Sequence, residues 1–425
     1  MRSKRILSTI LVLIITIGLI SCSGPSSEAP ASTGSESAEV EITESKPTKE
    51  TASSTLVATL ADVKSAVVQI EAQGTFVDPE GEYTGAGRGS GFIIDPSGLA
   101  ITNNHVVSGA ALLKVWIGGD ISKSYNAQIL AVSECSDLAL IDIDGDGFPY
   151  LEWYRDPITV GLEVYAAGFP LGDPEFTLTK GIVSKEQANG ESSWSSVNQV
   201  IEHDATINPG NSGGPLVTSD GQIVGVNYAS YAEAGQFFAI GRDTTLPIID
   251  KFKQGDDVDS LGINAYAVSN TDGSLTGIWV SSVRSGSAAD DAGLKPGDLV
   301  TTLEGLNLAE DGSLATYCDI IRTQGDENPL GMEIVRFDTG ETLEGQFNGR
   351  ALSVTGSFSS AGNPNNANNA NSSSTDDPIS NPGQFSSPNI IEVYDDGYMA
   401  ISDDYGALYV EIPSSWNQID GSLWT

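Results

Sequence analysis

Three residues far apart in the sequence could together perform nucleophilic catalysis. His105 lies in the segment TNNHVV, Asp137 in SDLAL and Ser212 in NPGNSGGPL. A serine hydroxyl attacks a carbonyl carbon effectively when a base removes its proton, and a histidine base works best when a buried carboxylate fixes its tautomer. The three segments supply one residue for each role. We therefore predict a catalytic triad with Ser212 as nucleophile, His105 as base and Asp137 as orienting carboxylate.

Glycine surrounds the candidate nucleophile. Gly210 precedes Ser212, and Gly213 and Gly214 follow it. Because glycine adopts backbone conformations that other residues avoid, this segment can turn tightly and aim two amides at one point. We predict that the N–H groups of Gly210 and Ser212 form an oxyanion hole. Such a turn could also be an ordinary loop, but the other two segments favour the catalytic interpretation.

The elements that must position these residues are predicted to be β-strands. From residue 56 to 252, short apolar runs alternate with turns of Gly, Asp, Asn and Pro, which is typical of antiparallel sheets. This length is enough for two packed antiparallel β-barrels, so the predicted fold class is mainly β. The order His, Asp, Ser is that of the chymotrypsin arrangement, and this resemblance implies two antiparallel six-stranded, chymotrypsin-like barrels. Helices are expected at 56–65 and 243–252.

A separate α+β domain is predicted at 257–350. Strand patterns there are combined with two helical patches, 288–292 and 314–322. Residues 355–388 form a low-complexity Asn, Ser, Pro and Gly tract, which indicates a linker. Residues 389–425 regain a pattern, with strands expected at 398–401 and 407–412. This short β segment either packs on another domain or begins a further one.

Several motifs of the first domain are shared with a known family. They are GSGFII at 89–94, AGFPLG at 167–172 and KGIVS at 180–184. With the settings of His105 and Ser212, these motifs resemble the HtrA/Deg family of extracytoplasmic serine proteases. The resemblance implies a serine endopeptidase that degrades unfolded or damaged proteins through an acyl-enzyme, and a homo-trimer. Two alternatives are a catalytically silent, chaperone-like binding lipoprotein and a scaffold that acts mainly through its second domain and its C-terminal segment.

The second domain resembles the PDZ module of the same family. SLGI at 260–263 is similar to the carboxylate-binding loop, and residues 286–298 are similar to the family's signature. The resemblance implies that Leu261, Gly262 and Ile263 bind a peptide C-terminus, whose carboxylate meets backbone amides while the peptide adds a strand. The alternative is a PDZ fold that only packs on the protease and binds nothing.

The residues near the nucleophile suggest an apolar substrate pocket. Thr206 lies where a trypsin-like enzyme would place an acid to receive Lys or Arg, and Ile207 and Val226 are apolar. We therefore predict that the S1 pocket accepts small or medium aliphatic residues. Asn211 stands where chymotrypsin-like zymogens carry an Asp, so activation by clipping is not expected.

The N-terminal residues indicate export and lipidation. A basic start and an apolar run at 1–21 are typical of a signal peptide, and LISC, ending at Cys22, resembles the bacterial lipobox. A lipidated Cys22 would anchor the protein on the extracytoplasmic side of a bacterial membrane, periplasmic or cell-surface. A plain cleaved signal or an uncleaved anchor is the alternative. Residues 22–55 are rich in Ser, Glu, Thr, Ala and Pro, which indicates a disordered tether.

Composition narrows the possible partners. The chain has 57 Asp and Glu against 20 Lys and Arg, a formal net charge of −37, so nucleic acid is a poor partner. No cofactor or metal is expected. The sequence DIDGDG from 142 is similar to the start of a calcium loop, but its twelfth position is Trp153, where the loop needs a Glu. His203 is interpreted as a surface or structural residue. Cys135 and Cys318 are expected to be buried, inert thiols.

Overall fold

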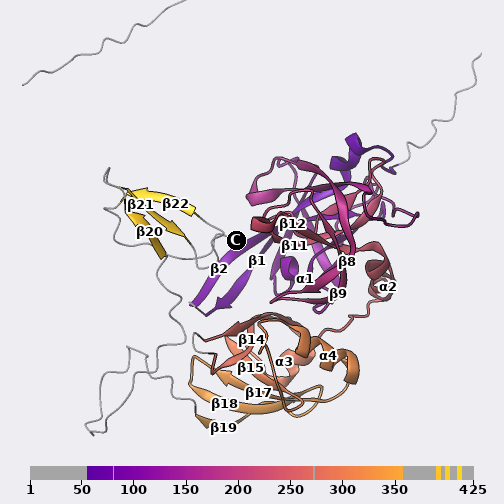
Figure 1. The fold of residues 1–425 in the computed structure, drawn as a ribbon. Helices are drawn as coiled ribbons and strands as arrows, with labels where there is room; N and C mark the ends of the chain where they lie inside the picture. Colours follow the sequence, from indigo (N-terminus) through magenta and orange to yellow (C-terminus); the bar gives the residue numbers. More distant parts are fainter. Residues whose placement is uncertain are drawn as a thin grey trace, which may run out of the picture. The chain divides into compact units, whose positions relative to one another are not determined.

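The computed structural model describes residues 55–79, 81–270 and 273–357 and three strands between 389 and 413 (Figure 1). The predicted signal peptide, Cys22 and nearly all of the tether lie outside the described residues, as does most of the linker. Within the described part of the chain, no helix is long and apolar enough to cross a membrane.

The first six strands form a closed antiparallel barrel. Its strand order is β1-β2-β3-β6-β5-β4, and β4 closes the barrel by pairing with β1. Inward-facing Val, Ile and Leu side chains fill its core. The 3₁₀ helix η1 leads into it and the short helix α1 follows β3 (Figure 1). The bounds are η1 (Leu60–Ala66), β1 (Val67–Asp78), β2 (Gly81–Ile93), β3 (Leu99–Thr102), α1 (Asn104–Val107), β4 (Leu112–Ile117), β5 (Tyr125–Ser133) and β6 (Leu138–Ile143).

The next six strands form a second closed barrel, in the order β10-β11-β12-β9-β8-β7. The predicted pair of six-stranded barrels is therefore confirmed. The expected helix at 243–252 is present as α2, whereas the one expected at 56–65 is η1 and begins later. The bounds are β7 (Glu163–Gly168), η2 (Pro170–Gly172), β8 (Thr177–Glu191), β9 (Ser196–His203), β10 (Pro215–Val217), β11 (Ile223–Tyr231), η3 (Ala232–Ala234), β12 (Gln236–Gly241) and α2 (Arg242–Phe252).

The following residues form an α+β domain, as expected. Its antiparallel sheet has the order β13-β14-β15-β17-β18-β19, with β16 paired to β15, so β13 is an edge strand. Helix α3 is capped at its N-terminus by Ser287, whose hydroxyl accepts from the Asp290 amide, and at its C-terminus by Gly293, with φ 85°. The bounds are β13 (Ile263–Ser269), β14 (Thr276–Val283), α3 (Ala288–Ala292), β15 (Asp298–Leu303), β16 (Leu306–Asn307), α4 (Ala315–Gln324), β17 (Leu330–Arg336), β18 (Glu341–Phe347) and β19 (Ser353–Ser357).

The C-terminal strands form a three-stranded antiparallel sheet of β20 (Asn389–Val393), β21 (Tyr398–Ser402) and β22 (Tyr409–Pro413). Two of these strands were expected from the sequence. The third, β20, follows directly on the low-complexity tract, so its short apolar run gave no separate signal. A two-stranded hairpin is only marginally stable alone, whereas a sheet of three strands reaches the usual minimum for independent stability.

The expectation of two inert thiols is wrong. Cys135 and Cys318 form a disulfide, although 183 residues separate them in the sequence. Cys135 lies between β5 and β6 of the first barrel and Cys318 on α4 of the α+β domain. Sequence separation does not limit the distance between two side chains in a folded chain, so spacing alone could not exclude the bond. The disulfide joins the two domains covalently.

His203, at the end of β9, is a buried structural residue rather than a surface one. Its ring stacks on Phe237 with centroids 6.2 Å apart, and neither ring nitrogen has a hydrogen-bond partner among the described residues. Burial disfavours the charged imidazolium and lowers the pKa of His203 to about 4.

Acid should therefore destabilise this protein partly through His203. His203 takes up a proton near pH 6.5 in the unfolded chain but only near pH 4 in the folded chain. The free energy of unfolding therefore decreases as the pH falls from 6.5 to about 4. We expect the loss of unfolding free energy between pH 7 and 4.5 to be smaller in His203→Gln, by up to about 3 kcal/mol. Urea unfolding at both pH values measures this loss, and each protein is compared with itself. Equal losses in both proteins would contradict the buried, neutral histidine.

Candidate active site

The side chains of His105 and Asp137 form a tightly bonded pair. His105 Nδ1 lies 2.7 Å from Asp137 Oδ2, and the His105 amide donates to Asp137 Oδ1 at 2.9 Å. Helix α1 holds the histidine and the loop before β6 holds the aspartate. Asp137 is fully buried, whereas the His105 side chain is 28% exposed. The carboxylate therefore fixes the ring through Nδ1 and leaves Nε2 for proton transfer.

A tryptophan that sequence reasoning missed completes the surroundings of Asp137. Trp194 Nε1 donates to Asp137 Oδ2 at 3.2 Å, and its ring lies edge-on to His105 with centroids 6.0 Å apart. Trp194 comes from the turn between β8 and β9 of the second barrel. A single aromatic residue in a polar turn gives no sequence signal for such a contact. It adds a third donor to the buried carboxylate.

Asp137 occupies an unusual backbone conformation. Its φ is 49°, in the left-handed region that few residues other than glycine enter. It closes a four-residue turn, because its amide donates to the Glu134 carbonyl at 3.2 Å, and its own carbonyl accepts from Asn103 Nδ2 at 2.8 Å. Left-handed positions of this kind occur often at functional sites, where surrounding contacts hold them. At Asp137, one of those contacts is the hydrogen bond from Asn103, which lies two residues before His105.

Ser212 lies in the loop between β9 and β10, against β2. Its carbonyl accepts from the Ser90 amide at 2.8 Å. A Cβ atom built on Gly89 would meet the Val106 side chain at 2.6 Å and the Ser212 carbonyl at 3.3 Å, so Ser212 and the helix of His105 flank the same point. Among the described residues, no hydrogen bond joins Ser212 Oγ to His105. The structure thus brings the three predicted residues to one region, with the last contact still open.

The glycines around Ser212 are required by close packing. Gly210 and Gly213 have φ of 95° and 82°. A Cβ on Gly213 would lie 2.3 Å from the Ser90 carbonyl and 2.3 Å from Thr102 Oγ1, so no larger residue fits. This packing holds the Ser212 loop of the second barrel against strands of the first.

Two amides beside Ser212 have no acceptor within the described chain. The Asn211 amide donates to the Asn208 carbonyl at 3.0 Å and the Gly213 amide to the Asn227 carbonyl at 2.8 Å. The amides of Gly210 and Ser212 donate to neither backbone nor side-chain acceptors there. Unpaired amides at such a turn can bind a developing negative charge. These are the two residues that the sequence assigned to an oxyanion hole.

The three residues assigned to the S1 pocket differ in burial and surroundings. Thr206 is exposed, and Thr179 Oγ1 donates to its carbonyl at 2.6 Å. Ile207 is 4% exposed and Val226 fully buried, and their side chains belong to two different apolar clusters. The S1 assignment stays a prediction.

The loop at 260–263 holds a carboxylate that belongs to the chain itself. Glu134 Oε1 accepts from the amides of Leu261, Gly262 and Ile263 at 3.1, 2.5 and 2.7 Å. The sequence assigned these three residues to carboxylate binding, but it gave no indication of Glu134. An acidic residue near a catalytic aspartate in the sequence is too common to attract attention.

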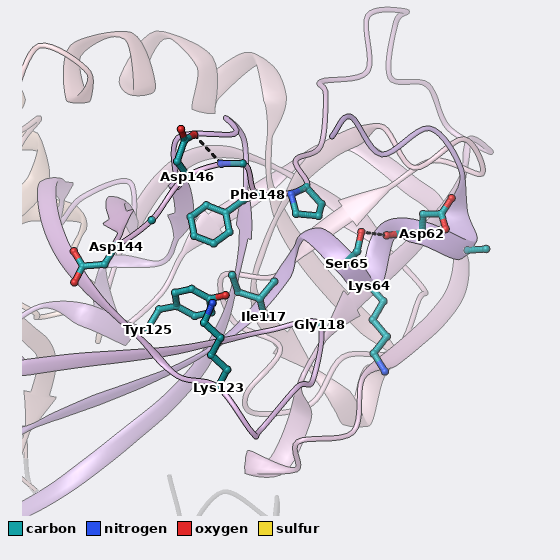
Figure 2. Close-up of a pocket in the computed structure, with 14 residues that line it drawn as sticks. Asp62, Lys64, Ser65, Ile117, Gly118, Lys123, Tyr125, Asp144, Asp146 and Phe148 are labelled. Carbon is teal, nitrogen blue, oxygen red and sulfur yellow. Dashed lines mark hydrogen bonds between the residues drawn. The ribbon is translucent and has the colours of Figure 1, made fainter. Parts of the chain in front are cut away.

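A separate cavity of about 890 Å³ lies on the first barrel, away from the triad. Figure 2 shows Lys123 beside the ring of Tyr125, and the ring of Phe148 lies next to that of Tyr125. Asp144 and Asp146 lie at the rim of the cavity. Lys123 Nζ is 4.3 Å from the centroid of the Tyr125 ring. None of the predicted site residues lines this cavity, so it is not the site of the predicted chemistry.

Comparisons with known proteins agree with this arrangement. Residues 89–226 match a trypsin-like peptidase domain and residues 279–330 match a PDZ domain. The fold and the site thus define a trypsin-like peptidase joined to a PDZ domain.

The chain is similar to several curated serine proteases. It is 36% identical over 241 residues to the "Probable periplasmic serine endoprotease DegP-like" of Marinomonas sp., covering 53% of this chain and 50% of that protein. It is 35% identical to the "Serine protease Do-like HtrA" of Bacillus subtilis, covering 53% and 56%. It is 30% identical to the "Putative serine protease HhoA" of Synechocystis sp., covering 62% and 71%. The chain spans about half the length of the first curated relatives that it matches. It belongs to the HtrA family of serine proteases.

Trp194 should act as a positioning residue for Asp137 and His105. Trp194→Phe keeps an aromatic ring against His105 but removes the hydrogen bond to the Asp137 carboxylate, and a bond to a charged group is worth about 1.5–3 kcal/mol. We expect the rate at which a fluorophosphonate labels Ser212 to fall at least about tenfold, with the fold retained. The matched control is Trp153→Phe, whose ring packs on Phe92 away from the triad. An equal loss in the control would contradict the role of Trp194.

Proposed function

We propose that this protein is a serine endopeptidase that works through an acyl-enzyme. The observation that carries the proposal is the buried Asp137–His105 pair beside a Ser212 loop in which two amides have no acceptor among the described residues. Each of these features also occurs singly in proteins that catalyse nothing. Together they supply a nucleophile, an oriented base and an anion site, which acyl transfer to serine requires.

In the proposed reaction, Ser212 Oγ bonds to the carbonyl carbon of the substrate and its proton passes to His105 Nε2. The carbonyl oxygen becomes an oxyanion that the amides of Gly210 and Ser212 stabilise. His105 then gives the proton to the leaving nitrogen as the C–N bond breaks, and a water repeats the sequence on the ester. Catalytic hydrogen bonds are often open in substrate-free enzymes, so the missing Ser212–His105 contact fits a resting state.

We further propose that the substrates are unfolded or damaged proteins outside the cytoplasm. Relatives carrying the words "periplasmic serine endoprotease" in their names support this location. Lipidation at Cys22 would anchor the protein to a bacterial membrane, and the PDZ domain would recognise peptide C-termini or regulate the protease. Assembly as a homo-trimer belongs to the same proposal.

The rival function is that of a catalytically silent, chaperone-like binding lipoprotein. The open contact between Ser212 and His105 is the one observation that favours it. Reactivity of Ser212 separates the two, because a binding protein has no need of an activated serine hydroxyl.

Fluorophosphonate labelling tests the proposed activity directly. We expect the probe to attach to Ser212 and the protein to cleave casein, because the base and the anion site activate this hydroxyl. Ser212→Ala should abolish labelling and lower cleavage by roughly a millionfold. Ser219→Ala, in an exposed turn of the same domain, is the matched control and should behave as wild type. Absence of labelling in folded protein, with and without reductant, would rule out the proposal.

Cleavage specificity gives an independent prediction. Thr206, Ile207 and Val226 offer no carboxylate to pair with a basic side chain, so a peptide library should be cut mainly after small or medium aliphatic residues. Sequencing of the cleavage products by mass spectrometry measures this preference. Cleavage mainly after Lys or Arg would overturn the assignment of these three residues to S1.

A further inference from the structure

The carboxylate-binding loop of the PDZ domain is already occupied. The carboxylate of Glu134, a residue of the protease domain, is almost fully buried in this loop, at 3% exposure for the residue. Oε1 accepts from the three amides at 261–263 and from Ser260 Oγ at 2.9 Å, and Oε2 accepts from the Tyr317 hydroxyl at 2.9 Å. Burial and the adjacent carboxylate raise the pKa of Tyr317, so its hydroxyl remains a donor. A peptide C-terminal carboxylate would need the same backbone amides.

The apolar pocket beside the loop is filled by the next residue of the same segment. Cys135 is fully buried and belongs to the apolar cluster of the PDZ domain, together with Leu261, Ile263 and Ile321. Its sulfur is bonded to Cys318 of α4. Cys135 therefore takes the position that a side chain near the end of a bound peptide would take.

The strand edge that a peptide would extend is also covered. β13 is the edge strand of its sheet, and its Ala267 amide donates to the carbonyl of Ser193 at 2.7 Å. Ser193 belongs to the turn between β8 and β9, which also carries Trp194. The adjacent Ser192 carbonyl accepts from the Leu314 amide, just before α4, at 3.1 Å. Protease residues thus meet the loop, the pocket and the edge of one peptide site.

The geometry points to a closed peptide site: Glu134 and Cys135 are a built-in ligand of the PDZ domain, and the Cys135–Cys318 disulfide holds them in place until a dithiol reductant opens it. The reductant gives two electrons and two protons to the S–S bond, leaving two thiols and itself becoming a disulfide. The chemical class of the competing ligand is a peptide with a free C-terminal carboxylate and a small apolar last residue, since the pocket holds a side chain of cysteine size.

The disulfide matters because a tethered ligand is hard to displace. A ligand segment on the same chain competes at an effective concentration near millimolar, and one bonded covalently to its pocket does not leave it at all. Disulfides persist in oxidising compartments outside the cytoplasm. The oxidised chain should therefore be unable to bind peptide, whatever the peptide concentration.

The peptide site of the PDZ domain is connected to the triad residues by the turn at 134–137. Glu134 and Cys135 are the first two residues of the turn that Asp137 closes, and Trp194 adjoins the turn residues that contact the PDZ domain. The effect that opening of the peptide site has on catalysis rests on the proposed function. Peptide binding does not depend on catalysis, so we measure it on the Ser212→Ala protein. Failure of the closed-site proposal and failure of the proposed function can then be told apart.

Fluorescence anisotropy with a short fluorescein-labelled peptide ending in a free Val carboxylate tests the closed site. We expect no binding to the oxidised chain, binding after treatment with dithiothreitol, and binding without reductant in Cys135→Ser/Cys318→Ser. Adding Glu134→Ala to that double variant should tighten binding at least about tenfold, because the tethered competitor is gone. The amidated peptide should not bind any form.

Matched controls keep this experiment decisive. Glu327→Ala removes an exposed acid of the PDZ domain and should change nothing. Circular dichroism confirms folding, and the dithiothreitol arm needs no mutation. Equal affinity of the oxidised and reduced chains, or no binding to folded, opened forms, overturns the proposal. So does free Cys135 in peptide maps of the oxidised protein.

Discussion

The buried carboxylate of Asp137 is the group on which the candidate site depends. A charge removed from water must be compensated by hydrogen bonds, and Asp137 receives them from the His105 amide, His105 Nδ1 and Trp194 Nε1. These donors come from both barrels, so the two barrels must pack together before the carboxylate is satisfied. The same contacts hold the left-handed backbone of Asp137 and aim the imidazole.

The four-residue turn at 134–137 contains two buried carboxylates, which point to different domains. Asp137 enters the protease site, and Glu134 enters the carboxylate loop of the PDZ domain. Both are compensated chiefly by donors from neighbouring segments rather than by a cationic partner. The Asp137 amide donates to the Glu134 carbonyl and closes this turn. The contact of the PDZ domain with Glu134 therefore lies in the same turn as Asp137.

The sequence predicted the features that short motifs and alternating apolar residues encode. The two six-stranded barrels, the α+β domain and the family followed from such patterns, and His105, Asp137 and Ser212 do lie in one region. Contacts between distant segments left no local signal. The Cys135–Cys318 bond, the Glu134 contact and the role of Trp194 depend on how the folded domains pack. Ile207 and Val226, which were assigned to S1 for their apolar character, are both buried in apolar clusters, and that assignment stays a prediction.

The central claim is that Ser212, His105 and the amides of Gly210 and Ser212 act on one reacting centre. A crystal structure of the protein after reaction with a peptidyl phosphonate tests this most directly. The account predicts a covalent bond from Ser212 Oγ to phosphorus, a phosphonyl oxygen within hydrogen-bond distance of both amides, and His105 Nε2 facing the adduct. An adduct on another residue, or a phosphonyl oxygen pointing away from the two amides, would contradict it.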